Sequence, residues 1–345
     1  MNEDKAPESV WEHSRWRRSA HRLWRTPHEE GDASKEPLGL WLTDDTVAIA
    51  RFDRVQAYRT TTGEPLWTWQ PPGEQVVGQV SADTEDGVGV VLHHDDGLLD
   101  VESIGLTSLA VDTGEVVRHR QQDAEPLGYL PYEMAVGGGL VAAAVKSWKG
   151  GEVTLRTLDV DTGEVQREHT LRDRRVGMTS AVSARPYVAH LEARGARGGP
   201  QLLVLDGYRK EPVTLALPDG YARFGERRVA VTGDVLAVEL IPADKAERDA
   251  GTRLGAFSMS SGELLWEWRS KGASMVPVAH RGWLLALHQY GRRLSVLDPA
   301  DGRVVAGRKL RADVYRPLLA ASGDVIAVGC GFGSTLRRLH VFRWR

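Results

Sequence analysis

The sequence has almost no cysteine, no long apolar run and no excess of charge of one sign. Its single cysteine, Cys330, excludes a disulfide within the chain. No stretch approaches the ~20 apolar residues that a membrane-spanning helix needs, and the first residues lack the apolar core of a secretion signal. The formal net charge is −3, which gives no electrostatic basis for binding nucleic acid. We therefore expect a cytoplasmic protein without a membrane span and without a nucleic-acid partner.

Signatures of familiar catalytic sites are also missing. The chain has no Gly-x-Ser-x-Gly elbow, no Gly-x-x-x-x-Gly-Lys phosphate loop and no His-Glu-x-x-His zinc motif. The glycine-rich segment 329–333 follows a β-prone run and does not open a helix, so we interpret it as a turn. These observations argue against an enzyme, and we expect no cofactor.

One short segment, 93–96, has the composition of a metal site. It contains two histidines followed by two aspartates, which are residue types that bind zinc and other transition metals. Neighbouring strand residues point to opposite faces, so His93 and His94 converge on one ion only if the strand has already ended. Because Gly97 follows, we favour a solvated loop over a metal site.

Against these absences stands a repeated pattern. A hydrophobic run, an Asp or Thr, a turn usually containing glycine and a second β-prone run recur in six segments: 57–67, 111–116, 159–165, 204–208, 259–266 and 296–304. The chain also has 37 glycines and 16 prolines, which suit many tight turns. Strand–turn–strand units repeated every ~40–50 residues are typical of a β-propeller.

A second marker gives the number of blades. An apolar or bulky residue followed by Gly or Pro opens each expected inner strand, at 38–39, 77–78, 127–128, 176–177, 224–225, 276–277 and 316–317. A nearly unbroken apolar run follows each marker, at 46–51, 88–93, 140–145, 187–191, 235–240, 283–288 and 325–329. Such runs are expected where both faces of a strand are covered. The fold class predicted is therefore all-β, a seven-bladed propeller of four-stranded antiparallel blades.

The last blade lacks residues for a fourth strand. Segment 339–344 matches a third strand, whereas segment 20–26 resembles the outer strands at 65–69 and 264–268. We predict that the N-terminal strand pairs with the C-terminal blade and closes the ring. The domain organisation is then a tail over 1–19, rich in Trp and Arg, followed by one propeller domain over 20–345.

Paired tryptophans occur in two expected outer strands. Trp67 with Trp69, and Trp266 with Trp268, share a sheet face because side chains alternate along a strand. Repetition at equivalent positions favours packing against the next blade over stacking on a carbohydrate. Two insertions, 188–200 and 241–252, are expected to protrude as loops, where binding residues are often found.

The repeat Asp-x-x-Thr-Gly-Glu-x-x-Trp is best kept in 60–67 and 258–266 and partly kept in 111–118 and 159–167. It resembles the tryptophan-docking repeat of the PQQ-like (quinoprotein) bacterial propellers, over roughly residues 20–345. Members of that family typically have eight blades and are exported, which this sequence does not indicate. Its dehydrogenases hold their cofactor beneath two adjacent cysteines, which a chain with one cysteine cannot supply. The resemblance implies the non-dehydrogenase branch, in which the propeller is a binding platform.

The best candidate site is the mouth of the central channel, where loops enter the inner strands. The polar residues expected there are Tyr129, Arg175, Arg223, Glu226, Tyr315 and Arg316. Arginines from several blades would form a positive rim suited to carboxylate or phosphate, although solvated surface arginines explain the pattern equally simply. We predict a non-enzymatic binding or scaffolding module that holds a protein partner or a small anionic ligand. The alternative is a lyase or hydrolase that uses Tyr129, Arg175, Glu226 or Tyr315.

Overall fold

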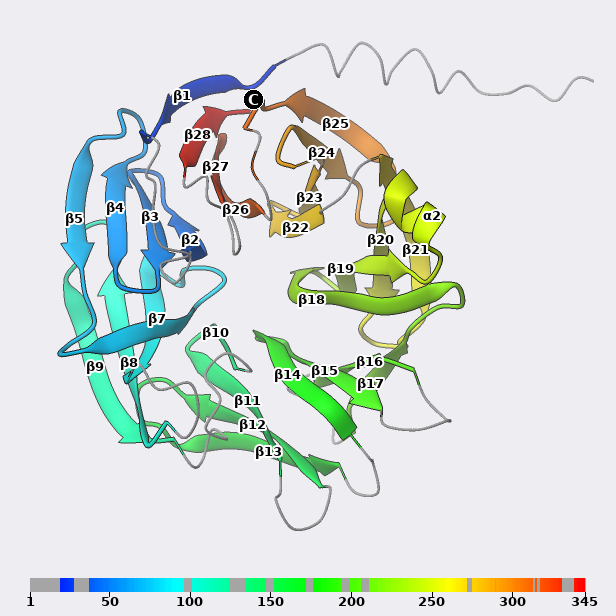
Figure 1. The fold of residues 1–345 in the computed structure, drawn as a ribbon, viewed down its shortest axis with the longest axis horizontal. Helices are drawn as coiled ribbons and strands as arrows, with labels where there is room; N and C mark the ends of the chain where they lie inside the picture. The colour runs from blue at the N-terminus through cyan, green and yellow to red at the C-terminus, as the bar shows by residue number, and fades with distance from the viewer. Residues whose placement is uncertain are drawn as a thin grey trace, which may run out of the picture.

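The computed structural model describes residues 19–27, 37–95, 101–124, 134–146, 152–171, 176–193, 199–205, 211–271, 275–288, 290–312, 314, 317–330 and 338–344. These residues form seven four-stranded sheets arranged around a central axis (Figure 1). Every strand pair within a sheet is antiparallel. The predicted seven-bladed propeller is therefore confirmed.

Each blade runs from an inner strand at the axis to an outer strand at the rim (Figure 1). Blade 1 contains β2 (Pro37–Leu42), β3 (Thr46–Arg51), β4 (Val55–Arg59) and β5 (Pro65–Trp69), and blade 2 contains β6 (Gln75–Val80), β7 (Val88–Asp95), β8 (Ser103–Ala110) and β9 (Val116–Asp123). Blade 3 contains β10 (Ala135–Gly137), β11 (Leu140–Lys146), β12 (Val153–Asp159) and β13 (Val165–Leu171), and blade 4 contains β14 (Val176–Ala184), β15 (Tyr187–Ala193), β16 (Gln201–Leu205) and β17 (Val213–Ala216).

The remaining three blades follow in chain order. Blade 5 contains β18 (Tyr221–Thr232), β19 (Val235–Pro242), β20 (Gly251–Ser258) and β21 (Leu264–Lys271), with the short helix α2 (Lys245–Ala250) between β19 and β20. Blade 6 contains β22 (Met275–His280), β23 (Trp283–His288), β24 (Arg293–Leu297) and β25 (Val304–Lys309). Blade 7 contains β26 (Pro317–Ser322), β27 (Val325–Cys330), β28 (Leu339–Arg343) and, as its outer strand, β1 (His21–Arg25). No helix among the described residues is long and apolar enough to cross a membrane.

Blade 7 is completed as predicted, by a strand from the opposite end of the chain. β1 pairs antiparallel with β28, with His21 opposite Arg343 and Arg25 opposite His340. Beyond β1, the Thr26 amide donates to the Leu339 carbonyl at 2.9 Å, and the Leu339 amide donates to the Thr26 hydroxyl oxygen at 3.0 Å. The ring is therefore sealed by backbone hydrogen bonds within one sheet.

The core lies between neighbouring blades, and the second strands are its centre. All six residues of β3 are buried, as the unbroken apolar runs of the sequence predict. One cluster joins blade 7 to blade 1 by packing Val341 and Leu339 against Leu40 and Ile49. Each fully buried side chain of this size stabilises the fold by about 1.5–3 kcal/mol, so the contacts between blades hold the ring together.

Tryptophans of the outer strands dock onto the next blade by one repeated geometry. Trp24, Trp67 and Trp266 cover the turn glycines Gly63, Gly114 and Gly302, each of which has a positive φ. Each indole N–H donates to the carbonyl three residues before that glycine: Trp24 to Thr60 at 2.7 Å, Trp67 to Val111 at 3.0 Å and Trp266 to Pro299 at 2.8 Å. A glycine is needed because a Cβ at these turns would overlap the indole. The packing interpretation of these tryptophans is confirmed.

Arginines replace the tryptophans between blades 2 and 3. Arg120 of β9 lies over Gly163 and donates to the Thr162 carbonyl, and Arg118 forms an ion pair with Asp161. The planar guanidinium takes the place of the indole and keeps a hydrogen bond to the next blade. By strand register Arg118 occupies the position of Trp67, so the glycine is covered here by a residue two positions further along the outer strand.

Two local predictions were wrong, and a third is only partly described. His93 and His94 lie within β7, which continues to Asp95, so these residues are not in a solvated loop. The insertion predicted at 188–200 begins with strand residues, because β15 runs to Ala193, and its residues 194–198 lie outside the described residues. The insertion at 241–252 contains α2, whose first turn is capped by the Asp244 carboxylate accepting from the Glu247 amide at 3.0 Å.

Candidate binding site at the channel mouth

The predicted mouth residues fall into two groups. Tyr129, Arg175, Tyr315 and Arg316 lie outside the described residues. Arg223 and Glu226 both belong to β18, the inner strand of blade 5, and the Arg223 side chain is exposed. Blade 5 is therefore the part of the predicted site that the structure describes.

A wide bulge interrupts β18 at this point. Phe224 pairs with Leu240 and the next pair joins Val229 to Val238, so four residues of β18, 225–228, face the single residue Glu239 of β19. A Cβ on Gly225 would lie 2.8 Å from the Glu239 Cβ, which is closer than side chains pack. The glycine thus makes room for the Glu239 side chain beneath the bulge.

Glu239 is the most unusual charged group of this region. Its Oε1 accepts a hydrogen bond from the Met275 amide at 3.2 Å, which ties β19 to the first residue of blade 6. Burial raises the pKa of Glu239 to about 7, although the Met275 hydrogen bond and the Arg223 charge both act to lower it. Near neutral pH this carboxyl group exchanges between charged and neutral forms.

Sequence reasoning missed Glu239, although a signal for it exists. The residue interrupts the apolar run 235–242, where a lone carboxylate would be costly to bury without a partner. The pattern predicts only a buried second strand, over residues 235–240. An acidic residue at such a position, opposite a glycine-containing inner strand, is the pattern that would have found it.

Further polar side chains surround the entry to blade 5. The Tyr221 hydroxyl donates to Glu267 Oε2 at 2.6 Å, and burial followed by this hydrogen bond raises the pKa of Tyr221. On the other side, Arg253 donates to Glu247 of α2 at 2.8 Å. These contacts fix the flanks of the bulge, so Arg223 is presented from a rigid frame.

The buried histidines have a structural role. The rings of His93 and His288 accept the edges of Trp69 and Trp268 from the preceding blade. Both nitrogens of His288 are hydrogen-bonded, to Ser270 at 2.5 Å and Ser295 at 3.0 Å. Burial lowers the pKa of His288 to about 3, which keeps the ring neutral.

His93 is held in the same way and does not reach a metal cluster. Its ring nitrogens contact Gln75 Oε1 at 2.6 Å and Thr107 Oγ1 at 2.8 Å. Burial lowers the pKa of His93 to about 4. Across the described part of the chain, no group of three His, Cys, Asp or Glu side chains is placed to bind a metal ion.

A family model described as outer membrane protein assembly factor BamB matches residues 15–215 and 250–340. These two stretches make up most of the chain. The chain belongs to this family. Its predicted resemblance to the PQQ-like propellers is thereby confirmed. No curated protein sequence matched the chain.

Solved structures of similar shape share little sequence with this BamB-family propeller. The mitotic checkpoint complex contains a chain with a TM-score of 0.59 and 13% identity, with 99% of this chain and 98% of that chain covered. BamB from Moraxella catarrhalis has a TM-score of 0.42 and 13% identity, with 91% of this chain and 85% of that chain covered. The computationally designed Ika8 protein has a TM-score of 0.48 and 11% identity, with 94% of this chain and 99% of that chain covered. The likeness to the checkpoint chain shows the propeller fold alone.

The BamB family model leaves one internal stretch unmatched, residues 216–249. This stretch contains Arg223, Glu226 and Glu239 as well as most of α2. The stretch of blade 5 that holds the bulge and Glu239 is thus one that the family model does not match.

Proposed function

We propose that this chain is a non-enzymatic binding module that holds a protein partner or a small anionic ligand at the blade 5 side of the channel mouth. One observation carries the proposal: the exposed Arg223 lies just before the wide bulge of β18, and its charge acts on the half-buried Glu239, within the stretch that the family model does not match. A guanidinium so placed can form two parallel hydrogen bonds to a carboxylate or phosphate.

Membership of the family supports a protein partner. The description of the family is that of an assembly factor, and assembly requires contact with other proteins. The exposed Arg223 and the protruding α2 provide a rigid, charged surface of the kind that steers association. The partner that we propose therefore carries carboxylate or phosphate groups where it meets β18.

The test is a comparative pull-down from a lysate of the source cells at low salt. The full chain, Arg223→Glu and the control Arg303→Glu are immobilised in parallel, and bound proteins are quantified by mass spectrometry. Arg303 is an exposed residue in the turn before β25, far along the chain from β18. We expect one or a few proteins to be lost with Arg223→Glu and kept with Arg303→Glu.

Equal capture by all three proteins would overturn the role of Arg223. A second readout separates the two kinds of ligand, because a tightly held small molecule is released when the purified chain is denatured. Release of such a molecule without any captured protein would favour the small-ligand form of the proposal over the protein partner, and turnover of that molecule by the purified chain would favour the lyase or hydrolase alternative.

The compartment is a separate proposal. We propose the cytoplasm, on the basis of the single cysteine, which suits a reducing compartment. Cell fractionation followed by immunoblotting tests it. Recovery of the protein in the envelope or periplasmic fraction would overturn it.

A further inference from the structure

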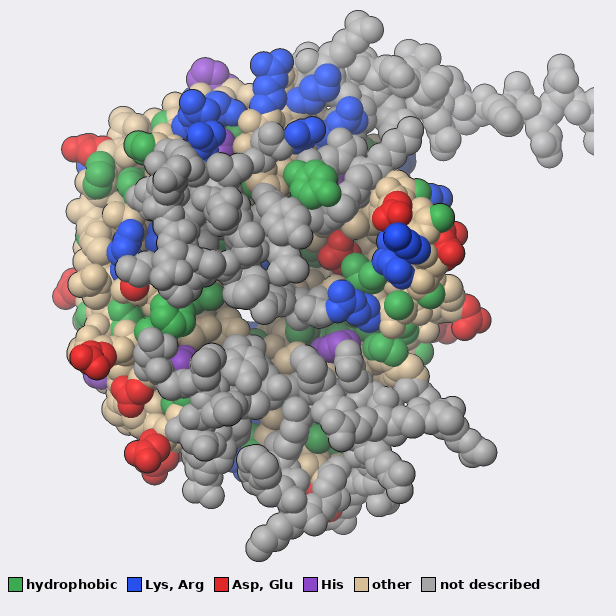
Figure 2. All heavy atoms as spheres, in the orientation of Figure 1, with side chains coloured by type: hydrophobic (Ala, Val, Ile, Leu, Met, Phe, Trp, Pro, Cys, Tyr) green, Lys and Arg blue, Asp and Glu red, His purple; other side chains and the backbone are tan. Residues whose placement is uncertain are grey.

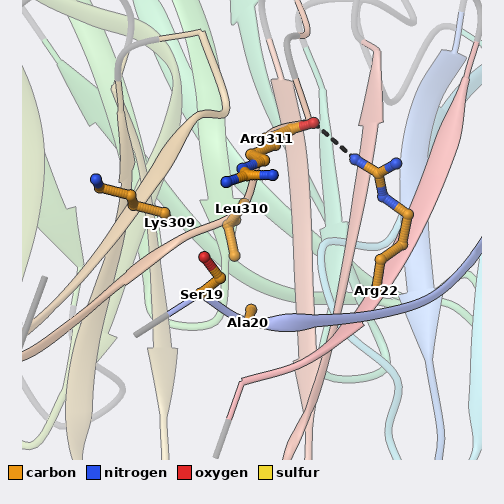
Figure 3. A pocket seen from close by; sticks show the side chains of 6 residues that line it. All are labelled: Ser19, Ala20, Arg22, Lys309, Leu310 and Arg311. Atoms are coloured by element: carbon orange, nitrogen blue, oxygen red, sulfur yellow. Dashed lines mark hydrogen bonds between the residues drawn. The ribbon is translucent and has the colours of Figure 1, made fainter. Parts of the chain in front are cut away.

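A hollow of about 220 Å³ lies on the outer rim where β1 passes from blade 6 to blade 7. Its lining residues, drawn in Figure 3, are Ser19, Ala20, Arg22, Lys309, Leu310 and Arg311. They come from both ends of the propeller: three precede or belong to β1, and three lie at the end of β25 and just after it. We call this hollow the seam pocket.

Backbone contacts hold the two walls of the seam pocket together. Ser19 forms an isolated bridge with Lys309, and the Ala20 amide donates to the Lys309 carbonyl at 3.0 Å. Arg22 reaches across the hollow and donates from Nη2 to the Arg311 carbonyl at 2.8 Å, as the dashed line in Figure 3 shows. Closure of the ring thus builds the pocket.

The backbone of Arg311 supports this geometry. Its φ is 56°, in the left-handed region that non-glycine residues rarely adopt. The carbonyl of this residue is the one that accepts from Arg22.

Positive charge gathers in the seam pocket. Arg22, Lys309 and Arg311 line it, and Figure 2 shows Lys and Arg side chains grouped over this part of the rim. Burial, followed by the charges of Arg25, Arg311 and Arg338, lowers the pKa of Arg22. No acidic side chain is among the described lining residues.

Arg22 also has unused hydrogen-bonding capacity. Its guanidinium lies 5.5 Å from the centre of the Phe342 ring, which fixes one face of the group. Its Nε is buried and has no acceptor among the residues that the structure describes. A buried donor without an acceptor is costly, and an anion in the hollow relieves that cost only if the Arg22 side chain turns to expose its Nε.

We propose that the seam pocket binds a small, multiply charged anion through phosphate oxygens, and that this anion bridges β1 to the end of β25. The hollow is of suitable size and is lined by two arginines and a lysine, and Arg forms paired hydrogen bonds to phosphate. The site is separate from the channel mouth and does not depend on the function proposed there.

Isothermal titration calorimetry of the full chain with inorganic pyrophosphate, at constant ionic strength set by sodium chloride, tests the proposal. We expect saturable binding to one site. Lys309→Gln and Arg311→Gln each remove one charge and should weaken binding about 10- to 100-fold. Both side chains are exposed, so these variants keep the fold even if Arg22→Gln does not.

The control is Arg303→Gln, an exposed arginine of the same blade that does not line the pocket. It should bind pyrophosphate as the unchanged chain does. If Arg303→Gln weakens binding as much as Lys309→Gln and Arg311→Gln do, the proposal is overturned. Absence of saturable pyrophosphate binding to the unchanged chain also overturns it, unless the chain binds vesicles that contain phosphatidic acid.

Free phosphate compounds and lipid headgroups share this chemistry, and a second arm separates them. Flotation with phosphatidylcholine vesicles, with and without phosphatidic acid, measures the lipid source. Vesicle binding that needs phosphatidic acid and is lost in Lys309→Gln would assign the site to a headgroup. Pyrophosphate binding alone would assign it to a soluble anion, and failure of both arms would refute the site.

Discussion

At the scale of single residues, Glu239 links the stability of the ring to pH. The carboxyl group lies under the β18 bulge and accepts a hydrogen bond from the Met275 amide, the first of blade 6. Its protonation state therefore affects the contact between blades 5 and 6. Burial holds its pKa at about 7 against an ordinary value of 4.5. The folded chain therefore keeps a proton that the unfolded chain has already released between these two values.

The sign of the effect follows from proton binding. Between pH 4.5 and pH 7 the folded state binds more protons at Glu239 than the unfolded state, so this residue makes stability fall as pH rises. Glu239→Gln keeps an oxygen that accepts from Met275 and carries no charge. We expect the variant to be more stable than the unchanged chain at pH 8, by about 2–3 kcal/mol, and nearly equal to it at pH 4.5.

Urea denaturation at the two pH values measures this difference. Glu74→Gln, which neutralises an exposed carboxyl group, is the matched control and should change little at either pH. An unchanged stability of Glu239→Gln at pH 8 would show that the carboxyl group is solvated in the folded chain.

At the scale of elements, the docking of an outer strand onto the next blade is the repeated device of the fold. Trp67 covers Gly114 and donates to Val111, and Trp266 repeats the same contacts at Gly302 and Pro299. The indole contributes both apolar burial and one hydrogen bond, so the two can be removed separately.

We expect Trp67→Ala to lower the free energy of unfolding by about 3 kcal/mol, because it leaves a cavity beside Gly114 and orphans a carbonyl. Trp67→Phe keeps most of the apolar contact and loses only the hydrogen bond, at a cost of about 1 kcal/mol. Chemical denaturation followed by circular dichroism measures both. Equal losses for the two variants would mean that the hydrogen bond, and not the packing, carries the contact.

Strands were predictable because their patterns repeat. The second strands predicted at 46–51 and 283–288 match β3 and β23 residue for residue, since burial on both faces demands an unbroken apolar run. The helix α2 escaped prediction because its six residues carry no apolar face. Asp244 is a good helix cap and the residues after it include good helix formers. These signals were overlooked because the insertion was interpreted as a loop.

The site was less predictable than the fold. Arg223 was identified because it flanks an inner-strand marker, whereas Glu239 was missed because its burial depends on the β18 bulge and on Met275 of another blade. The seam pocket was missed for a similar reason. Its walls are distant in the sequence, and no local pattern shows that Arg22 meets Arg311.

At the scale of the whole molecule, ring closure through β1 protects an otherwise open sheet edge. Leu23 and Trp24 pack on the core shared by blades 7 and 1, and β1 covers the outer edge of β28. Without β1, the backbone groups on the outer edge of β28 would be unpaired and able to pair with another chain, while the other edge stays paired with β27.

Deletion of residues 1–26 is therefore expected to lower the free energy of unfolding by more than about 3 kcal/mol and to cause self-association. Deletion of residues 1–18 keeps β1 and is the matched control, which should behave as the full chain does. Size-exclusion chromatography with light scattering gives the oligomeric state. A monomeric, equally stable 1–26 deletion would show that β1 contributes nothing to closure.

The same closure constrains the order of events during protein synthesis. The hydrogen bond between Thr26 and Leu339 joins residues 313 positions apart, so at ribosomal rates β1 waits for roughly 15–60 s before its partner strand exists. Trp24 can meet the turn at Gly63 long before that. In the growing chain, β1 can thus dock on blade 1 first. When β28 emerges, the strand with which it pairs is then already in position.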